Sequence, residues 1–466
     1  MLTYSFDSKG KESLYEFLYK SIRNDILSGK LSKQEKLPSK RALAEHLGIS
    51  TITVENAYNQ LMAEGYIYSK VKSGYYVSPI DSPKVSTAED TRRYSVEEVS
   101  EEPLIYSADF TNSASVQESF PFDTWAKLMR QILSDKREKL MLNSPSIGVR
   151  ELRVAVSDYL FQFRGISADP ECIVIGAGTE YLYSLIIQLL GRDKKYALED
   201  PGYRKIAQIY KSNNINFEYI TLDSEGIDRN ALEKSDAQVL HISPSHHFPT
   251  GIVTPVSRRY ELLSWAGESP ERYIIEDDYD SEFRFLGKPI PSLQSIDNLH
   301  KVIYINTFSK SLASTIRISY MVLPKELMQR YKEELSFYSC TVSTFEQYTL
   351  AAFIQQGYFE KHINRMRNYY RTQRDTVMTS IKSHPLYSKI KIKEEDSGLH
   401  FLMEIDTQRS DEELTKTAKE RGVNLSCLSQ YCHNSETAPQ HTLIISYSGL
   451  PKEGIDSAVE KLFECI

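Results

Sequence analysis

Apolar residues recur every four positions near the start of the chain, within residues 13–28, at Leu14, Leu18, Ile22 and Ile26. This spacing puts all four on one face of a helix. We therefore expect an amphipathic helix at 13–28 that packs its apolar stripe against other elements.

Two shorter helical patterns follow. Ser39 can cap a helix that runs through Leu47, because its hydroxyl can accept from a free N–H of the first turn. Ser50 can cap a second helix that reaches about Glu64. Gly48 lies between them and can adopt the left-handed conformation of a tight turn. Two short helices joined in this way predict a helix-turn-helix.

Alternating side chains then predict a hairpin of two strands, Tyr66–Tyr68 and Tyr75–Val77, whose tip carries Lys70 and Lys72. Such a hairpin beside a helix-turn-helix is a wing. The alternative is a small helical interaction domain without a DNA partner. Because motif, wing and charge agree, we expect residues 1–79 to be a DNA-binding domain.

The charge of the chain is unevenly distributed. The whole chain carries −7, whereas residues 1–79 hold 11 Lys and Arg against 8 Asp and Glu, a net of +3 that leaves −10 for the remainder. A mildly basic head on an acidic body permits nucleic-acid binding by the head alone.

Residues 80–104 contain two prolines, directly after a third at Pro79, with several acidic residues and little apolar material. This composition predicts a flexible, solvated tether. A strand pair at 92–96 is the less favoured alternative. A tether of this length would let the head reach a neighbouring subunit.

From residue 105 to the end, helical and strand patterns alternate, which is typical of an α/β architecture. The clearest expected helices are 124–133, 148–163 and 354–382. Strands are expected at 399–405 and 442–447. We expect 105–466 to form one large effector domain whose smaller α/β part covers roughly 340–466.

Five short apolar runs in this body read as strands and are each followed by polar groups. The runs are 172–175, 195–198, 239–242, 273–275 and 302–305, and the groups that follow are Gly178 with Thr179, Tyr203, His246, Asp277 with Tyr279, and Ser309 with Lys310. Ligands of open α/β sheets bind at the carboxyl ends of strands. Together these groups suit one cofactor with a phosphate, a ring nitrogen, a phenolic oxygen and an aldehyde, which is pyridoxal 5′-phosphate (PLP).

Lys310 is the candidate nucleophile of this set. It stands between small hydroxyl residues, with Ser309 before it and Arg317 a short step after it. A hydroxyl and a guanidinium are suitable donors for a phosphate, and a lysine with a lowered pKa can attack an aldehyde. By itself, such a residue is more often an ordinary surface lysine.

The segment Glu276–Asp280 holds four carboxylates at the end of an apolar run. A metal site is the obvious alternative. We discount it because no histidine or cysteine lies beside them in the sequence, and a pyridinium nitrogen needs one such buried carboxylate. Asp277 is our candidate.

Composition and length set further limits. A chain of 466 residues predicts two to three domains. No apolar run approaches the ~20 residues of a membrane span, and the start shows no export signal. We expect a cytoplasmic protein with no membrane partner. The five cysteines are scattered and odd in number, as expected of reduced thiols, and the cluster at 427–433 lacks zinc-site spacing.

Residues 1–79 resemble the GntR-type winged helix-turn-helix, through Leu37-Pro38-Ser39-Lys40-Arg41, Leu43-Ala44, Ala57-Tyr58, Leu61, Glu64-Gly65 and Gly74. The resemblance implies that DNA is contacted by Ser39, Lys40, Arg41, Ser50, Thr51, Thr53, Lys70, Lys72 and Gly74. The family often has arginine at the position of Thr51, so hydroxyl or methyl contacts are expected there.

Residues 105–466 resemble a fold-type I aminotransferase, through SPSHHFPTG, YIIEDDYDSEF and INTFSKSL with Arg317 in that order. Head and body together resemble the MocR group of GntR regulators. Members form domain-swapped, head-to-tail homodimers. The implied cofactor roles are the internal aldimine for Lys310, the pyridinium nitrogen for Asp277, the phenolic oxygen for Tyr279, ring stacking for Tyr203, a place beside the ring for His246, and the phosphate for Gly178, Thr179, Ser309 and Arg317.

Three departures from the group concern the amino-acid pocket. The arginine that clamps a substrate carboxylate is missing, and Gly449 stands about where the GABA-sensing regulator GabR has it. Lys205 replaces a second arginine, and Ser314-Thr315 replace a Pro-Gly pair. The chain is thus most similar to the PdxR subgroup, which implies a sensor of PLP that controls vitamin B6 synthesis rather than an enzyme. A GabR-like sensor of an amino acid or amine, and an active aminotransferase with a DNA-binding head, are the alternatives.

Overall fold

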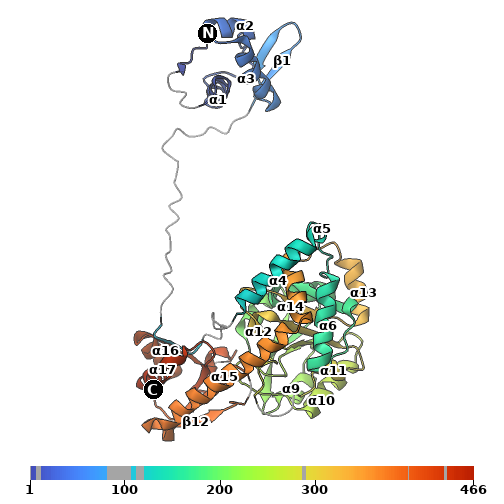
Figure 1. The fold of residues 1–466 in the computed structure, drawn as a ribbon, viewed down its shortest axis with the longest axis vertical. Helices are drawn as coiled ribbons and strands as arrows, with labels where there is room; N and C mark the ends of the chain where they lie inside the picture. The colour runs from blue at the N-terminus through green and yellow to red at the C-terminus, as the bar shows by residue number, and fades with distance from the viewer. Residues whose placement is uncertain are drawn as a thin grey trace. The chain divides into compact units, whose positions relative to one another are not determined.

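The computed structural model describes residues 2–6, 12–80, 106–111, 120–285, 290–396, 398–434 and 438–466. The chain divides into two compact units, Met1–Pro103 and Leu104–Ile466 (Figure 1). The expected tether at 80–104, apart from its first residue, and the alternative strand pair at 92–96 lie outside the described residues.

The first unit contains three helices and a hairpin, as the sequence predicts. They are α1 (Leu14–Leu27), α2 (Lys40–Leu47), α3 (Thr51–Ala63), β1 (Ile67–Lys70) and β2 (Gly74–Val77). The strands pair antiparallel from Ile67 opposite Val77 to Lys70 opposite Gly74. The stripe of α1 and the inner faces of α2 and α3 share one core, which includes Leu18, Ile22, Leu43, Val54, Ala57, Tyr58 and Leu61.

The turn between α2 and α3 follows from three residues. The Ser39 hydroxyl accepts from the N–H of Ala42, and the Ser50 hydroxyl accepts from the N–H of Thr53. Gly48 ends α2 with φ at +66°, a left-handed conformation that costs other residues strain. These caps hold α3 at a fixed angle to α2, which is the helix-turn-helix.

The second unit is built on a mixed sheet of eight strands. Their order is β4 (Ile173–Gly176), β11 (Ser319–Val322), β10 (Val302–Thr307), β9 (Tyr273–Asp277), β8 (Val239–Ile242), β5 (Tyr196–Asp200), β6 (Phe217–Asp223) and β7 (Gly226–Ile227). The neighbours from β10 to β6 pair parallel, and β11 runs against both β10 and β4. The carboxyl ends of β4, β5, β8, β9 and β10 therefore meet at one edge.

Helices alternate with these strands along the chain, as expected for an α/β architecture. They are α4 (Phe122–Asp135), α5 (Arg137–Leu140), α6 (Arg150–Arg164), α7 (Thr179–Leu190), α8 (Arg204–Ser212), α9 (Arg229–Glu233), α10 (Val256–Gly267), α11 (Leu293–Ile296), α12 (Phe308–Ser311), α13 (Lys325–Glu334) and α14 (Thr344–Gln355). Three apolar clusters fill the space between these helices and the sheet. The expected α/β class is confirmed.

The C-terminal part adds a smaller, antiparallel sheet. Its order is β12 (Ile390–Lys393), β13 (His400–Ile405), β16 (Thr442–Ser446) and β15 (Ser426–Cys427). One core joins it to α15 (Tyr358–Ser383), α16 (Asp411–Glu420) and α17 (Ile455–Cys465). A further parallel pair joins β3 (Ala108–Asp109) to β14 (Val423–Asn424). Single 3₁₀ turns lie at Pro170–Cys172, Pro385–Lys389, Leu428–Tyr431 and Lys452–Gly454.

The long helix α15 runs from the region of α12 and α14 to α17 and β12 (Figure 1). The single helix expected at 354–382 is wrong at its beginning. Gly357, with φ at +74°, separates α14 from α15, because a left-handed residue interrupts the helical hydrogen bonds. None of the helices among the described residues is long and apolar enough to cross a membrane.

Candidate functional site

A cavity of about 550 Å³ opens at the carboxyl edge of the large sheet. This is within the usual size range for small-molecule sites. The cavity brings together seven of the residues that the sequence predicts for a cofactor, namely Thr179, Tyr203, Asp277, Tyr279, Ser309, Lys310 and Arg317. They lie at or after the carboxyl ends of four strands that are far apart in the sequence, β4, β5, β9 and β10.

Lys310 lies on α12, a single helical turn directly after β10. The Thr307 hydroxyl caps this turn by accepting from the N–H of Ser309, and the Ser319 hydroxyl donates to Thr307. Burial lowers the pKa of the Lys310 amine, and the Asp280 carboxylate opposes this effect. A lower pKa favours the neutral, nucleophilic amine.

Asp277 ends β9 with its carboxylate buried. One carboxylate oxygen, Oδ2, accepts a short hydrogen bond from the hydroxyl of Tyr183, and the other, Oδ1, is buried with no hydrogen-bond partner among the described residues. An unpaired buried oxygen is costly, so Oδ1 fits a cationic N–H donor such as a pyridinium. Tyr183 is not among the residues that the sequence predicts for the site. Its position one turn after Thr179 on α7 was the available signal.

The same cavity has groups that fit a phosphate. The Ser309 hydroxyl is buried without a hydrogen-bond partner among the described residues. Gly178 begins α7 with φ at +92°, and a side chain there would lie 2.2 Å from the Arg317 guanidinium. Arg317 itself has φ at +52°, a strained value for a residue that is not glycine. A helix N-terminus beside an arginine is suited to an anion.

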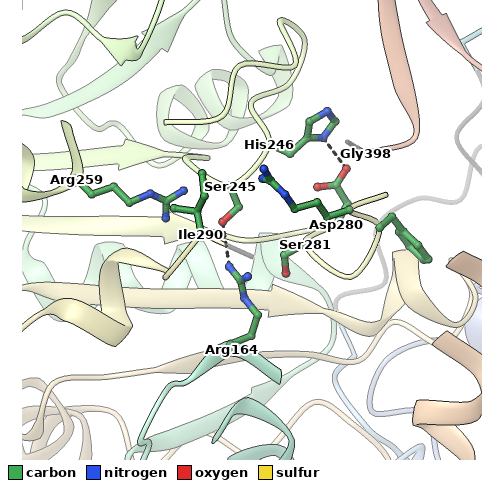
Figure 2. Close-up of a pocket in the computed structure, with 10 residues that line it drawn as sticks. Arg164, Ser245, His246, Arg259, Asp280, Ser281, Ile290 and Gly398 are labelled. Atoms are coloured by element: carbon green, nitrogen blue, oxygen red, sulfur yellow. Dashed lines mark hydrogen bonds and ion pairs between the residues drawn. The ribbon is translucent and has the colours of Figure 1, made fainter. Parts of the chain in front are cut away.

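His246 lies in a smaller neighbouring pocket, outside the lining of the main cavity (Figure 2). Its Nδ1 is 2.8 Å from Asp280 and 3.3 Å from the hydroxyl of Tyr279. An added side chain at Gly398 would come within 1.8 Å of the imidazole ring. His246 thus contacts Tyr279, which lines the cavity, but it does not line the cavity itself.

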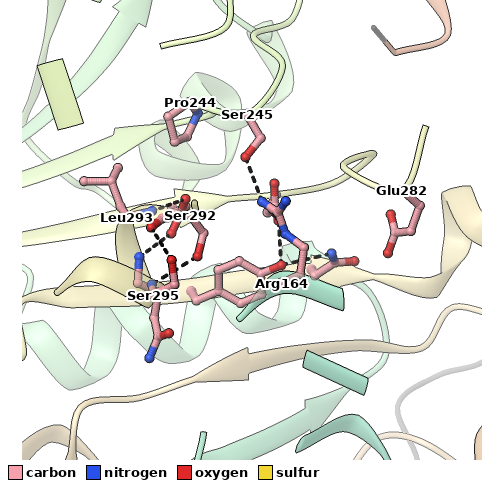
Figure 3. Close-up of polar contacts among 12 residues, drawn as sticks. Arg164, Pro244, Ser245, Glu282, Ser292, Leu293 and Ser295 are labelled. Carbon is pink, nitrogen blue, oxygen red and sulfur yellow. Dashed lines mark hydrogen bonds and ion pairs between the residues drawn. The ribbon is translucent and has the colours of Figure 1, made fainter. Parts of the chain in front are cut away.

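The four carboxylates of 276–280 each have separate partners. Glu276 accepts from the backbone N–H groups of Leu293 and Gln294 at the start of α11, next to Ser292 and Ser295 (Figure 3). The Asp278 carboxylate lies 2.8 Å from Arg164, and Asp280 pairs with His246. No cluster of three or more metal-ligating side chains occurs among the described residues.

Tyr203 precedes α8 and is 49% exposed. Its ring stands edge-on to Phe248, with centroids 5.7 Å apart. One face of the Tyr203 ring can therefore pack on a planar ligand.

The C-terminal strand contributes little charge to the cavity. Ser446 lines it, whereas Gly449 lies outside the lining. The cationic lining residues are Lys205, Lys310 and Arg317, and the carboxylate of Glu180 pairs with both Lys205 and Arg317. Glu180 is a second residue that the sequence analysis did not identify.

The predicted DNA-contacting residues differ in accessibility. Arg41, Thr51, Lys70 and Lys72 are exposed. Lys40 is half-buried, because its amine pairs with Glu55 at 2.7 Å. The hydroxyls of Ser39 and Ser50 already cap helices, and Ser50 is 2.8 Å from the hydroxyl of Thr53. Gly74 begins β2.

The outer face of α3 contains residues that the sequence analysis passed over. Ile52 is 68% exposed, and Asn56 and Asn59 are exposed on the same side of the helix. Spacings of three and four residues put these side chains on one face.

Comparison with known proteins agrees with both units. Residues 14–77 match the bacterial regulatory proteins of the gntR family, and residues 111–462 match aminotransferase class I and II. The uncharacterized HTH-type transcriptional regulator YdeL of Bacillus subtilis strain 168 is 38% identical over 96% of each chain. The probable rhizopine catabolism regulatory protein MocR of Rhizobium meliloti is 30% identical over 95% of this chain and 92% of the relative.

The chain is a MocR-type member of the GntR regulators. The pyridoxine biosynthesis regulator PdxR of Corynebacterium glutamicum is also similar to this MocR-type regulator, at 28% identity over 89% of this chain and 88% of the relative. Among solved structures, a kynurenine aminotransferase from Pyrococcus horikoshii superposes with a TM-score of 0.68 at 23% identity, over 78% of the regulator and 91% of the enzyme. That likeness shows the aminotransferase fold of the body.

Proposed function

We propose that this MocR-type regulator binds PLP in the cavity around Lys310 and that PLP is its effector. The observation that carries the proposal is the pair of unsatisfied buried oxygens, Asp277 Oδ1 and Ser309 Oγ, on residues that line one cavity together with Lys310. A ring nitrogen and a phosphate on the same molecule would satisfy both.

When bound, PLP supplies an aldehyde that condenses with an amine. The Lys310 amine would bond to that carbon, Asp277 would hold the ring nitrogen, and Tyr279 would donate to the phenolic oxygen. Tyr203 would pack on the ring. Gly178, Thr179, Ser309 and Arg317 would hold the phosphate, and His246 would orient Tyr279 and Asp280 from the neighbouring pocket.

The cavity chemistry supports a sensor of PLP itself. If Arg317 holds the phosphate, Lys205 is the cation left for a substrate carboxylate, and it is paired with Glu180. Control of vitamin B6 synthesis genes is supported by the similarity to PdxR. A sensor of amines and an aminotransferase remain the competing functions.

In the head, we propose that Arg41, Lys70 and Lys72 contact phosphates, with Ser39, Ser50, Thr51, Thr53 and Gly74 close to the DNA backbone. The outer face of α3 would read bases in the major groove. Asparagine pairs with adenine and apolar groups contact the thymine methyl, so Ile52, Asn56 and Asn59 favour A·T pairs.

We further propose a domain-swapped, head-to-tail homodimer. Large apolar side chains are exposed on the body at Phe122 (67%), Met141 (74%) and Leu142 (67%). Apolar patches of this kind are typical of interfaces. Sedimentation of the full chain and of a Met141→Glu variant tests it, with a smaller species expected for the variant.

The decisive experiment is a titration of purified regulator with PLP, followed by absorbance and by binding to operator DNA. We expect a visible band that is missing in Lys310→Ala, together with a change in operator binding. Retention of the band in Lys310→Ala would refute the role of this lysine. A response to amino acids with sustained product formation would favour the aminotransferase, and a response without turnover would favour the amine sensor.

A further inference from the structure

Glu180 lies in the first turn of α7, two residues after Gly178, which caps the helix. One of its carboxylate oxygens, Oε2, lies 2.6 Å from the Arg317 guanidinium. The other, Oε1, accepts from the amine of Lys205. The carboxylate therefore bridges two cations that both line the cavity.

This bridge occupies the part of the site that fits a phosphate. A side chain at Gly178 would meet the Arg317 guanidinium at 2.2 Å and Glu180 Oε2 at 2.8 Å. Both groups therefore lie close to the N-terminus of α7. The anion at this helix end is the protein's own carboxylate, that of Glu180.

Glu180 is negatively charged at all physiological pH values. Burial of the side chain opposes ionisation, but hydrogen bonds from Lys205, from the backbone and from Arg317 outweigh it and lower the pKa to about 2. A bound phosphate ester is also an anion, with about −1.5 to −2 charges at neutral pH. Two anions cannot share one guanidinium without repulsion.

We propose that Glu180 is a built-in competitor for the phosphate of PLP, and that its release from Arg317 sets the PLP concentration at which the sensor fills. This inference rests on the proposed function. Lys205 makes the exchange feasible, because it can keep the displaced carboxylate paired after Arg317 has turned to the phosphate. The lysine thus has a role other than holding a substrate carboxylate.

The test compares the full-length wild type with Glu180→Gln. The amide keeps the shape of the side chain and removes its charge. We expect the dissociation constant of PLP to fall about 10-fold, equivalent to about 1.4 kcal/mol. Pyridoxal has the same ring and aldehyde but no phosphate, so its dissociation constant should change less than about 2-fold.

Glu151→Gln is the matched control. Glu151 has a similar exposure to that of Glu180, 32% against 29%, and it also pairs with two cations, in this case Lys136 and Lys139. Its substitution should leave both dissociation constants unchanged. Lys205→Met should weaken PLP binding in the wild type, because displaced Glu180 loses its second partner, and should have little effect in the Glu180→Gln background.

Several outcomes would overturn the inference. The first is an affinity for PLP that is unchanged or weaker in Glu180→Gln. The second is an affinity for pyridoxal that rises as much as the affinity for PLP, which would indicate a general change of the cavity. If PLP binding is abolished by Lys310→Ala while Glu180→Gln behaves as wild type, only the competitor role fails. If PLP binding does not depend on Lys310 in either the wild type or Glu180→Gln, the proposed function fails as well.

Discussion

The buried ion pair between Arg164 and Asp278 gives a sharp test of the energetics behind the site. Arg164 is the last residue of α6 and lies 2.8 Å from Asp278, with side-chain exposures of 9% and 0%. The Tyr304 hydroxyl donates to the same carboxylate at 2.6 Å, and Arg164 also donates to Ser245 at 3.0 Å (Figure 3). Burial opposes the charge of Asp278, but Arg164 and the hydroxyl donors outweigh it and lower the pKa.

Arg164→Met leaves this carboxylate buried without its cation. Removing one partner of a buried pair costs about 3–5 kcal/mol, whereas replacing both partners can be nearly neutral. We therefore expect Arg164→Met to lower the free energy of unfolding by about 3–5 kcal/mol. The double variant Arg164→Met/Asp278→Asn should recover most of that loss, because neither charge remains.

Denaturant unfolding followed by tryptophan fluorescence reports on the structural unit that contains this ion pair. The chain has two tryptophans, Trp125 and Trp265, and both lie in the unit Leu104–Ile466. Arg330→Met is the control, since Arg330 pairs with Glu334 on the surface at 47% and 46% exposure, where a pair stabilises by about 0.3–0.5 kcal/mol. A loss below about 1 kcal/mol in Arg164→Met, or no recovery in the double variant, would refute the reasoning.

Three further predictions concern other parts of the protein. Gly398→Ala should destabilise the body by about 2 kcal/mol or more in the same assay, since its side chain would come within 1.8 Å of His246, whereas Gly357→Ala, with open space around it, should cost only about 1–2 kcal/mol. Burial raises the pKa of Glu199 to about 8, above its unfolded value, so its contribution to stability falls as pH rises from about 4.5 to about 8. Glu199→Gln should therefore remove up to about 1.4 kcal/mol per pH unit from the slope of unfolding free energy against pH. An unchanged slope would contradict the raised pKa of Glu199. Arg41→Ala should reduce the salt dependence of operator binding by about one counterion, while Lys40→Ala should do less because Lys40 is paired with Glu55; equal effects would count against the pairing.

The sequence predicted the elements that local chemistry determines. Ser39, Gly48 and Ser50 mark the boundaries of α2 and α3, because caps and left-handed turns depend on a few neighbouring residues. The strand at 239–242 was predicted at its observed bounds, because it is a short apolar run ended by turn residues. The order of strand ends then indicated which polar groups would meet.

Contacts between side chains that are far apart in the chain could not be predicted from the sequence. Lys40 looked like a free basic residue, and only packing brings it 2.7 Å from Glu55. Glu180 looked like an ordinary first-turn acidic residue, although it meets Arg317 from 137 positions away. His246 is expected beside the ring, and it lies outside the lining of the main cavity, 3.3 Å from the hydroxyl of Tyr279. Ion pairs of this kind depend on tertiary distances, which no local pattern encodes.

The helix α15 links the lysine to the far side of the body. His362 on α15 donates from Nε2 to the backbone carbonyl of Ser311, the residue after Lys310, at 2.9 Å. Burial lowers the pKa of His362 to about 4, so this link stays neutral and intact at physiological pH. A helix of 26 residues is about 39 Å long, and its other end packs against α17 in the core of the small sheet. If the helix moves as a rigid rod, a tilt of about 5° at the lysine turn would displace its far end by about 3 Å.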